Sequence, residues 1–465
     1  MNFSKESYLY AQQLSKATMK KIDVLVIGGS AGGLTAAISA RRNYPDKDIT
    51  LVRREEKVVV PCGIPYIFGT LGSVEKNLIP VDEMLSANKM ESIIDEVTEI
   101  DRAKKVVKTA KGEEIGYEKM ILATGSLPII PPIPGVDLEH VFVANKDVEY
   151  LSGMLKTIEA SKRVVIIGGG FIGMEFADDL TKRELDITVV EMLPHCLQLN
   201  FDDEFCDKVE EKLKEKGVKL LTDTTAEEIG GEKGKGVEYV KLKGGEKLNA
   251  DVVILGIGTR PNTEIGEKAG LKIGDTHAVW VDDFQKTSDP DIFAVGDCAE
   301  KRFSLTGTPA PLLLSSIAGM EAKIAGANLF GLRYKNDGAA GAFATVMGDT
   351  AFGAVGLTER SAKEAGIEYV KGEFTTTDKH PGTLPDTKES HLKLLFTKSG
   401  EIIGGEVYGG IATGEFTNII ATLIEKRMRI DELVTLQIAT HPWLTASPIG
   451  YLISNAAEMA IGELI

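Results

Sequence analysis

Two glycine-rich turns are the residues whose spacing most directly implies chemistry. The second has the form G-x-G-x-x-G, with glycines at Gly168, Gly170 and Gly173 after an apolar run. Glycines at these positions allow a tight turn, a close approach of the backbone to a pyrophosphate, and close packing of the next helix, whose N-terminus faces the anion. The pattern predicts a dinucleotide site that includes Ile172 inside the turn. A tight turn without a ligand is the alternative.

An acidic residue ends the strand expected after this second turn. It is Glu191, which closes the apolar run that follows the predicted helix. A carboxylate at that place can hold both ribose hydroxyls of a dinucleotide and repels a 2′-phosphate. NADH is therefore the expected cofactor of the second turn, and NADPH is the less favoured one.

The first glycine turn departs from this pattern in two ways. Gly28 and Gly33 fit, but the middle position is Ser30. The end of the next strand, where an acid is expected, holds Arg53. If a carboxylate reaches the ribose at this turn, the candidates are Glu55 and Glu56. The first turn taken alone is thus a less specific dinucleotide pattern than the second.

Other predicted strands also end in polar or glycine-containing turns. The apolar run at residues 292–295 leads into Gly-Asp, which places Asp297 where it can accept hydrogen bonds from a polyol. Another strand leads into Thr124 and Gly125, and a further one into a turn that contains Gly258. A strand that simply ends in a turn is the alternative for each of them, and only the two glycine motifs make a binding role the better interpretation.

One cysteine has a setting that favours chemistry. Cys62 lies between the first predicted βαβ unit and the next helix, flanked by two prolines and by Gly63. Glycine there lets the chain pass close to a planar ring, and the start of a helix stabilises a thiolate. A lone cysteine is more often a small buried hydrophobic residue. That structural interpretation is kept for the three others, Cys196, Cys206 and Cys298.

The elements that must position these residues follow from hydrophobic periodicity. Each glycine turn lies between an apolar strand and a helical pattern, followed by a second β-branched strand. The strands are expected at residues 22–27, 49–52, 163–167 and 187–190, and the helices at 34–42 and 174–183. These are two βαβ units, and hence two doubly wound folds. The proline-rich stretch 128–135 can continue neither a helix nor a central strand, which predicts a crossover between domains.

The C-terminal part has a different pattern. From about residue 340, short strands at 392–396 and 402–407 precede helices at 415–426 and 449–460, which is typical of a separate α+β domain. The predicted fold class is therefore α/β, with two doubly wound dinucleotide-binding domains and an α+β C-terminal domain. A chain of 465 residues is long enough for about three domains at roughly 150 residues each.

Composition excludes several classes of protein. The net charge of −16 disfavours a nucleic-acid partner, and no run of about 18 apolar residues predicts a membrane span. Four cysteines at these spacings indicate neither a disulfide framework nor a zinc site, so no metal is expected. The first 21 residues lack the apolar core of a signal peptide, and reduced thiols favour the cytoplasm.

Taken in order, these motifs resemble those of the FAD-dependent pyridine nucleotide–disulfide oxidoreductases over about residues 22–465. The resemblance implies FAD on the first turn with Asp297, NADH on the second with Glu191, and a homodimer formed by the C-terminal domain. It places an FAD-binding domain at 21–145 and 275–335, an NAD-binding domain at 146–274, a dimerisation domain at 336–465, and an extension at 1–20. The residues expected at the two cofactor sites are Gly28, Ser30, Ala31, Gly33, Glu55, Thr124, Gly125, Asp297, Gly168, Gly170, Ile172, Gly173, Glu191 and Gly258.

The single cysteine resembles one branch of that family, which contains coenzyme A disulfide reductases, NADH oxidases and peroxidases, and polysulfide or persulfide reductases. Cys62 takes the place of the redox cysteine, and the second cysteine of the two-cysteine members is Ile67 here. Its redox partner must then be external, as a mixed disulfide, a persulfide or a sulfenic acid. Peroxidases carry a histidine where this chain has Ala31, which argues against peroxide reduction.

A histidine in the C-terminal part is the second catalytic candidate. His441 precedes a proline in a stretch where coenzyme A disulfide reductases carry a tyrosine that crosses to the partner. The stretch is more similar to the His-Pro of two-cysteine reductases, although their following glutamate is Ala446 here. We hypothesise that His441 of one subunit protonates the thiolate that leaves the other subunit's Cys62. A surface histidine is the alternative, and His380 is expected to be structural.

Three functions stay open at this level. The first is the reduction of a small disulfide, persulfide or polysulfide, coenzyme A disulfide included. The second is an NADH oxidase that passes electrons to O2. The third is an electron-transfer flavoprotein that serves a protein partner, with Cys62 idle.

Overall fold

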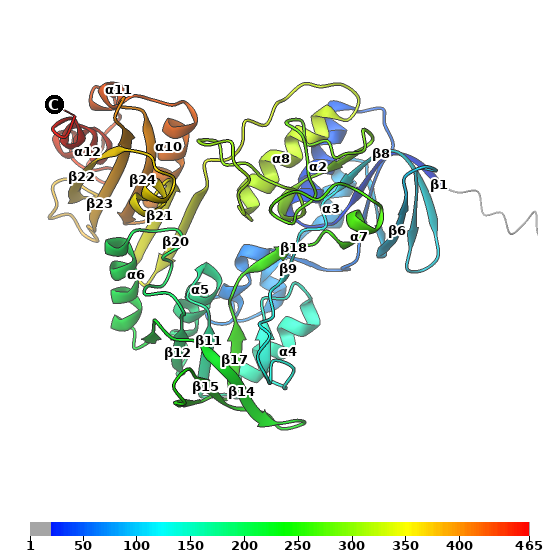
Figure 1. Cartoon of the computed structure of the whole chain (residues 1–465), viewed down its shortest axis with the longest axis horizontal. Helices are drawn as coiled ribbons and strands as arrows, with labels where there is room; N and C mark the ends of the chain where they lie inside the picture. Colours follow the sequence, from blue (N-terminus) through cyan, green and yellow to red (C-terminus); the bar gives the residue numbers. More distant parts are fainter. Residues whose placement is uncertain (1–19, 465) are drawn as a thin grey trace, which may run out of the picture.

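The computed structural model describes residues 20–464 and arranges them around three main sheets (Figure 1). The predicted extension at 1–20 lies outside the described residues except for Lys20, which begins the first strand. Two of the sheets are built largely from parallel strands and the third is antiparallel. The predicted fold class is confirmed.

The first sheet has seven strands in the order β5-β2-β1-β8-β7-β6, with β19 paired to β8. Its strands are β1 (Lys20–Ile27), β2 (Ile49–Arg53), β5 (Glu91–Ile94), β6 (Val97–Asp101), β7 (Val106–Thr109), β8 (Glu114–Leu122) and β19 (Ile292–Ala294). The helices beside it are α2 (Ala31–Asn43), α3 (Val81–Ala87), α7 (Glu264–Lys268) and α8 (Ser315–Asn328). Because Ile27 and Ala294 both pair with Leu122, β1, β8 and β19 end at one edge of the sheet. The predicted turns that contain Gly28, Thr124 and Asp297 therefore meet at this edge.

The second sheet is parallel, in the order β10-β17-β11-β12-β13. Its strands are β10 (Val141–Val143), β11 (Arg163–Ile167), β12 (Asp186–Val190), β13 (Lys219–Leu221) and β17 (Val252–Leu255), and its helices are α4 (Val148–Glu159), α5 (Phe171–Leu180) and α6 (Asp203–Glu215). A small antiparallel sheet joins β14 (Ala226–Glu232), β15 (Gly236–Leu242) and β16 (Lys247–Asn249). Strand β11 is apolar apart from its first residue, as expected for a parallel strand covered on both faces.

Two short antiparallel strands connect the first two sheets. They are β9 (Ser126–Pro128) and β18 (Thr259–Pro261), which pair with each other where the chain leaves one sheet and later returns to it. No helix or strand follows Pro128 until β10, as the proline-rich stretch predicts. Strand β10 pairs within the second sheet although its residues fall inside the segment expected for the first domain. Helix α7 packs near β6 of the first sheet although it falls inside the segment expected for the second.

The third sheet is antiparallel, in the order β20-β21-β24-β23-β22. Its strands are β20 (Ala342–Met347), β21 (Thr350–Gly356), β22 (Tyr369–Thr377), β23 (Glu389–Thr397) and β24 (Ile402–Gly409). Its helices are α9 (Glu359–Glu364), α10 (Thr413–Glu425), α11 (Ile430–Val434) and α12 (Leu452–Ile461). Leu392 and Leu394 share one hydrophobic cluster with Ile420 of α10 and Ile453 of α12, so these two helices cover the same face of the third sheet, α10 over β21 and β24 and α12 over β22 and β23.

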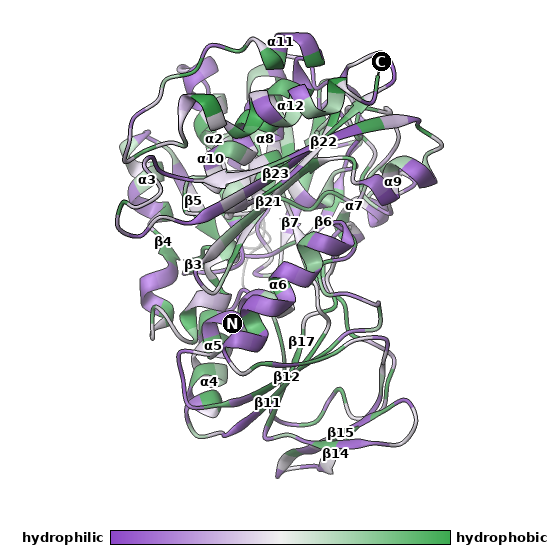
Figure 2. Ribbon diagram, turned by 90° about the vertical axis from the view of Figure 1, so that its left-hand side faces the viewer, coloured by the Kyte–Doolittle hydropathy of each residue, from purple (hydrophilic) through white to green (hydrophobic). Residues whose placement is uncertain are grey.

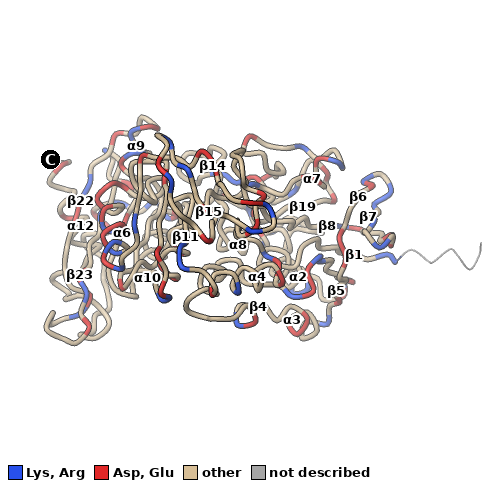
Figure 3. Tube along the Cα trace, turned by 90° about the horizontal axis from the view of Figure 1, so that it is seen from below, with Lys and Arg blue, Asp and Glu red and all other residues tan. Residues whose placement is uncertain are grey.

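Hydrophobic segments concentrate in the sheets, whereas α6, which carries polar residues on most of its surface, is largely hydrophilic (Figure 2). Basic and acidic residues are interspersed along the trace (Figure 3). Within residues 20–464, no helix combines the length and the apolar character needed to span a bilayer.

Candidate active site

The first glycine turn joins β1 to α2 and is packed too tightly for side chains. Gly28 has a φ of +118°, and a Cβ atom there would lie 2.1 Å from the carbonyl oxygen of Ala123. A Cβ on Gly33 would lie 1.9 Å from the carbonyl oxygen of Gly28. Ser30 is the N-cap of α2, and its side chain makes no capping hydrogen bond. Together with Ala31, the first residue of α2, it leaves the N-terminus of the helix available to an anion.

The second glycine turn repeats this geometry between β11 and α5. Gly168 has a φ of +111°, and a Cβ on Gly173 would lie 1.9 Å from the carbonyl oxygen of Gly168. By contrast, Gly170 is exposed, and a Cβ there would meet no described atom within 4 Å. The open side of the turn therefore has room for a pyrophosphate at the start of α5, where Ile172 is the second residue.

Glu191 lies beneath this second turn, at the end of β12. Its Oε2 accepts a hydrogen bond of 2.5 Å from the backbone N–H of Gly169, and its Oε1 accepts one of 2.8 Å from that of Leu193. A carboxylate oxygen has two lone pairs, so each oxygen can still accept a ribose hydroxyl. Glu191 thus fixes the turn and keeps acceptors for a ligand.

Arg53 occupies the corresponding place beneath the first turn, but it is used differently. Its side chain is buried, and a Cβ on Gly29 would lie 2.8 Å from the Arg53 Cβ. Its Nη2 donates to both carboxylate oxygens of Asp82 at 2.7 Å, and its Nη1 donates to the carbonyl oxygen of Glu55 at 2.6 Å. The guanidinium is therefore held by α3 and by the following loop. The carboxylate of Glu55, paired with Arg54 at 2.9 Å, lines the adjacent cavity.

The turns after β8 and β19 meet beside the first glycine turn. Gly125 has a φ of +71°, and its carbonyl oxygen accepts a 2.9 Å hydrogen bond from the N–H of Asn262. The hydroxyl of Thr124 donates to the carbonyl oxygen of Asn262 at 2.7 Å. The hydroxyl of Ser126 donates to Oδ2 of Asp297 at 2.7 Å, so Asp297 is tied to the same edge.

A cavity of about 330 Å³ opens over this edge. The residues that line it include Gly28, Ser30, Glu55, Thr124 and Gly125. It thus brings together five residues predicted separately from the sequence. Gly258, with a φ of +96°, belongs to the turn between β17 and β18. A cavity of this size at a helix N-terminus above parallel strands fits a dinucleotide.

Cys62 lies in the 3-10 turn η1 (Pro61–Gly63) and is an exposed free thiol. The expected helix start is therefore only a three-residue turn. A longer helix approaches the thiol instead, because Sγ lies 3.1 Å from Oγ of Ser315, the first residue of the 14-residue α8. The N-terminus of such a helix favours negative charge. The reason for glycine at position 63 is packing, since a Cβ there would lie 2.0 Å from Oδ1 of Asn77.

Three acidic residues of α5 connect the cysteine segment with the other two sheets. Asp179 is fully buried and accepts hydrogen bonds from the backbone N–H groups of Gly69 at 2.6 Å and Thr70 at 3.1 Å, just after the 3-10 turn η2 (Pro65–Ile67). Asp178 accepts a 2.7 Å hydrogen bond from the N–H of Gly348, between β20 and β21. The segment that follows Cys62 is thereby docked onto the helix of the second glycine turn.

Glu175, the third of these residues, was not singled out by the sequence. Burial raises the pKa of Glu175 to about 7, although a 3.0 Å hydrogen bond from the hydroxyl of Thr345 opposes the shift. Burial and the nearby charge of Glu175 raise the pKa of Tyr66, the residue four positions after Cys62. A glutamate within the helix of a glycine turn is the only sequence signal that could have identified it.

His441 is exposed and lies in a run of exposed residues before η5 (Pro448–Gly450). Its Nδ1 accepts a 3.3 Å hydrogen bond from the N–H of Trp443. His380 supports the same segment, because its backbone N–H donates to the carbonyl oxygen of Pro442 and its Nδ1 lies 3.0 Å from that of Thr445. Within the described residues of one chain, His441 does not contact Cys62.

Comparison with known proteins accounts for this arrangement. Residues 22–310 match the family model of the pyridine nucleotide-disulphide oxidoreductases, and residues 342–448 match the dimerisation domain of the same family. An NADH oxidase of Methanocaldococcus jannaschii is 32% identical over 95% of this chain and 99% of that protein. An NAD(P)H coenzyme A polysulfide/persulfide reductase of Pyrococcus horikoshii is 32% identical over 84% of this chain and 88% of that protein.

Solved structures agree with these sequence relatives. An NAD-dependent persulfide reductase from A. fulgidus superposes with a TM-score of 0.89 at 32% identity, over 95% of this chain and 83% of that one. The glycine turns, the cavity at the sheet edge and the exposed thiol fit the FAD and NAD(P)H that the family uses, and its dimerisation domain makes the protein a homodimer. The chain belongs to the pyridine nucleotide-disulphide oxidoreductases and is an FAD-dependent NAD(P)H oxidoreductase.

Proposed function

We propose that the protein uses Cys62 to reduce a small disulfide, persulfide or polysulfide at the expense of NADH. The observation that carries this proposal is the position of the thiol. Cys62 is exposed and 3.1 Å from the first residue of α8, whereas the other three cysteines are buried. Burial raises the pKa of Cys196 to about 12, which makes that thiol a poor nucleophile. The reductase named among the relatives acts on polysulfide and persulfide, which is the chemistry that an accessible single thiol supports.

The two cofactors are proposed at the two glycine turns. The turn of Gly28 and Asp297 would hold FAD, and the turn of Gly168 with Glu191 would hold NADH. When bound, FAD accepts the hydride of NADH and makes two electrons available for a sulfur–sulfur bond. The chain's own residues bind and orient: the N-termini of α2 and α5 face phosphates, and Glu191 excludes a 2′-phosphate by charge.

At the sulfur, the Cys62 thiolate attacks one sulfur of the substrate. A Cys62–substrate disulfide forms, the substrate's own sulfur–sulfur bond breaks, and the leaving thiolate takes a proton. Two electrons from NADH then cleave the mixed disulfide, which releases the second thiolate and restores Cys62. Ser315, 3.1 Å from Sγ, can donate a hydrogen bond to the Cys62 thiolate before the attack and again after its release.

The protonation step is proposed for His441 of the partner subunit. The run of exposed residues around His441 includes Trp443, 51% exposed, and Leu444, 70% exposed. Apolar side chains exposed in this way are typical of a surface that another copy covers. The match to the dimerisation domain includes this run. Imidazole is suited to the task because its ordinary pKa lies near neutrality.

His441→Ala is expected to lower the turnover of disulfide or polysulfide by about a hundredfold, because general acid catalysis contributes about that much. The oxidation of NADH by O2 should be unchanged, because no thiolate leaves in that reaction and none has to be protonated. Steady-state rates with both oxidants, measured on the dimeric variant, check this. His277→Ala is the matched control, because His277 is an exposed histidine of the loop between α7 and β19. Equal disulfide turnover in His441→Ala and the unmodified protein would leave His441 without this role.

An anaerobic titration tests the proposed function itself. The protein is first incubated with coenzyme A disulfide and freed of excess, so that a reactive Cys62 carries an adduct. We expect it to consume two equivalents of NADH per flavin and to develop a long-wavelength absorbance from the Cys62 thiolate beside the flavin. A single equivalent without that absorbance would contradict the proposal. A parallel titration with NADPH, expected to be much slower, tests the specificity proposed for Glu191.

The second candidate function is NADH oxidase activity towards O2. Its support is the relative from Methanocaldococcus jannaschii that carries this name. Ala31, at the N-terminus of α2, offers no acid for further reduction of peroxide, so peroxide is the product proposed for this activity. The same titration distinguishes the two, since an oxidase needs one equivalent of NADH per flavin.

The proposal also covers the domain boundaries. We place the passages between the FAD-binding and NAD-binding domains at β9 and β18, because β10 pairs in the second sheet and α7 packs near the first. The dimerisation domain then follows from about residue 336.

All four cysteines are free, which supports a reducing compartment such as the cytoplasm. Detection of the native protein in a cytoplasmic fraction checks this placement.

A further inference from the structure

A buried ion pair lies directly behind the turn that carries Asp297. Glu321 of α8 is 0% exposed, Lys301 is 3% exposed, and the Lys301 Nζ lies 3.4 Å from the Glu321 Oε2. The turn itself is the 3-10 segment η4 (Gly296–Cys298), which follows β19. The pair is outside the turns that the sequence motifs mark.

Both members of the pair hold the backbone of one residue. The N–H of Gly296 donates to the Glu321 Oε2 at 2.8 Å, and the Lys301 Nζ donates to the carbonyl oxygen of Gly296. Lys301 also donates to the carbonyl oxygen of Ala299 at 2.9 Å. Gly296 has a φ of +71°, so the direction in which the chain enters Asp297 depends on a left-handed residue clamped on both sides. The pair therefore fixes the backbone that leads into Asp297.

Burying the two charges of this pair costs desolvation free energy, which a purely structural contact would not need. The Oε1 of Glu321 is buried and has no hydrogen-bond partner among the described residues. Burial raises the pKa of Glu321 to about 7, while the charge of Lys301 and the N–H of Gly296 oppose the shift. Apolar side chains of similar volume are often at least as stable as a buried ion pair. A charged pair at this place thus calls for a role that apolar side chains could not fill.

The same helix also reaches the thiol. Helix α8 begins at Ser315, beside Cys62, and carries Glu321 further along, where it contacts Gly296. One rigid element therefore connects the position of the reactive sulfur with the turn at the polyol. A change at Glu321 is expected to act on the flavin through this turn.

We propose that Glu321 and Lys301 are positioning residues that hold the Gly296–Asp297 turn and thereby set the affinity and the reduction potential of FAD. The inference rests on the placement of FAD in the proposed function. Glu321 contributes in two ways: its oxygen accepts the hydrogen bond of the turn, and above its pKa of about 7 its negative charge lies behind the site that becomes more negative when the flavin is reduced. The two contributions predict separate measurable effects.

Glu321→Gln keeps an acceptor for Gly296 and removes the charge. In the holoenzyme at about pH 9, where Glu321 is ionised, we expect the midpoint potential of FAD to become more positive, because a negative charge no longer opposes reduction. The dissociation constant of FAD should change less than about threefold. An unchanged potential would contradict the role of the charge. Glu406→Gln is the matched control, a buried glutamate beside a buried lysine in the third sheet, and should leave the potential unchanged.

The double variant Glu321→Met with Lys301→Met removes both clamps and leaves no unpaired charge. It should fold, since it replaces an ion pair by apolar side chains. We expect the dissociation constant of FAD to rise about tenfold, as for the loss of a hydrogen bond to a charged group. Wild-type affinity in the folded double variant would overturn the proposal. Neither measurement depends on Cys62, so failure of the sulfur chemistry and failure of this inference are distinguishable.

Discussion

Cys62→Ser is expected to lower the reduction of coenzyme A disulfide or polysulfide by about a thousandfold or more. A serine oxygen fills nearly the same space and can still contact Ser315, but it is not ionised near neutral pH and forms no disulfide bond. The NADH-to-O2 reaction of the bound flavin should continue. The measurement is the steady-state rate with each oxidant, at equal flavin content.

This variant separates the three functions that the sequence leaves open. A sulfur reductase collapses, an oxidase survives as a slow O2-reducing enzyme, and a protein that serves an electron-transfer partner keeps its full rate with that partner. Cys206→Ser is the matched control, because that thiol is buried and donates to the carbonyl oxygen of Phe201. Full disulfide turnover in Cys62→Ser would refute the mechanism proposed here.

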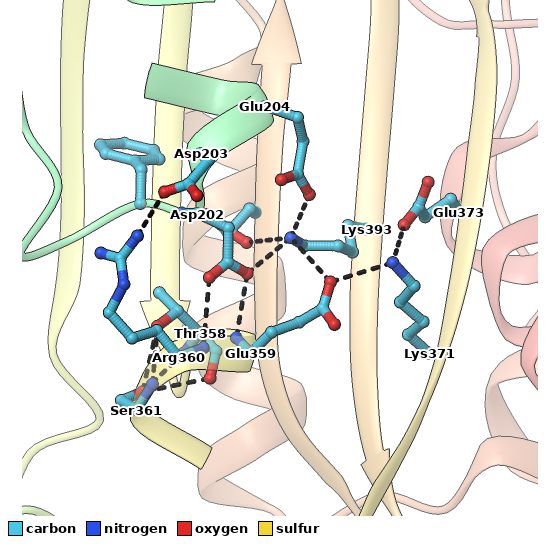
Figure 4. Close-up of polar contacts among 12 residues, drawn as sticks. Asp202, Asp203, Glu204, Thr358, Glu359, Arg360, Ser361, Lys371, Glu373 and Lys393 are labelled. Carbon is cyan, nitrogen blue, oxygen red and sulfur yellow. Dashed lines mark hydrogen bonds and ion pairs between the residues drawn. The ribbon is translucent and has the colours of Figure 1, made fainter. Parts of the chain in front are cut away.

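Lys393→Met is expected to lower the free energy of unfolding by about 3–5 kcal/mol, as for other buried pairs that lose one partner. The Lys393 side chain is 0% exposed, and its Nζ lies 2.6 Å from Asp202, 2.8 Å from Glu406 and 3.5 Å from Glu359. It also donates to Glu204 (Figure 4). Lys393 points away from α10 and α12, because its neighbours Leu392 and Leu394 face them. The lysine therefore joins the third sheet to the start of α6.

The effect should depend on pH in a defined direction. Burial raises the pKa of Glu406 well above 4.5, and the charge of Lys393 opposes that shift. A carboxyl group with a raised pKa in the folded state costs stability as the pH rises from its unfolded pKa through the folded one. Without Lys393 that cost increases. The difference between Lys393→Met and the unmodified protein should thus be largest at about pH 8 and shrink towards pH 5, when urea unfolding is compared.

Two further variants make the test specific. Lys371→Met removes a neighbouring lysine that is 38% exposed and pairs with Glu359 and Glu373 at 2.9 Å, and it should cost less than about 1 kcal/mol. Adding Glu406→Gln to Lys393→Met should restore part of the lost stability, because one uncompensated charge disappears. An equal loss in Lys371→Met and Lys393→Met would contradict the account of the buried cluster.

The architecture and the two glycine turns could be predicted from the sequence because their signals are local. In β1 and β11 the apolar runs lead directly into glycines, and the observed φ of Gly28 and the contact of Gly33 explain why no other residue fits. The helix expected at 34–42 is α2, which begins three residues earlier, at the turn itself. The flanking glycine and prolines also set Cys62 apart from the other three cysteines, and the structure shows that it is the exposed one. The catalytic and cofactor roles of these residues stay predictions.

The tertiary structure alone decided how distant residues complete the site. Arg53 ends β2 where the sequence pattern calls for an acid, and only the structure shows that it pairs with Asp82 of α3. Ser315 approaches Cys62 from α8, and Lys301 and Glu321 meet behind Gly296. No spacing in the sequence predicts these contacts. They depend on which elements pack together once the parallel strands have brought their carboxyl ends to one edge of the sheet. The sequence determined the turns and the thiol, while long-range packing decided the charges and hydrogen bonds that surround them.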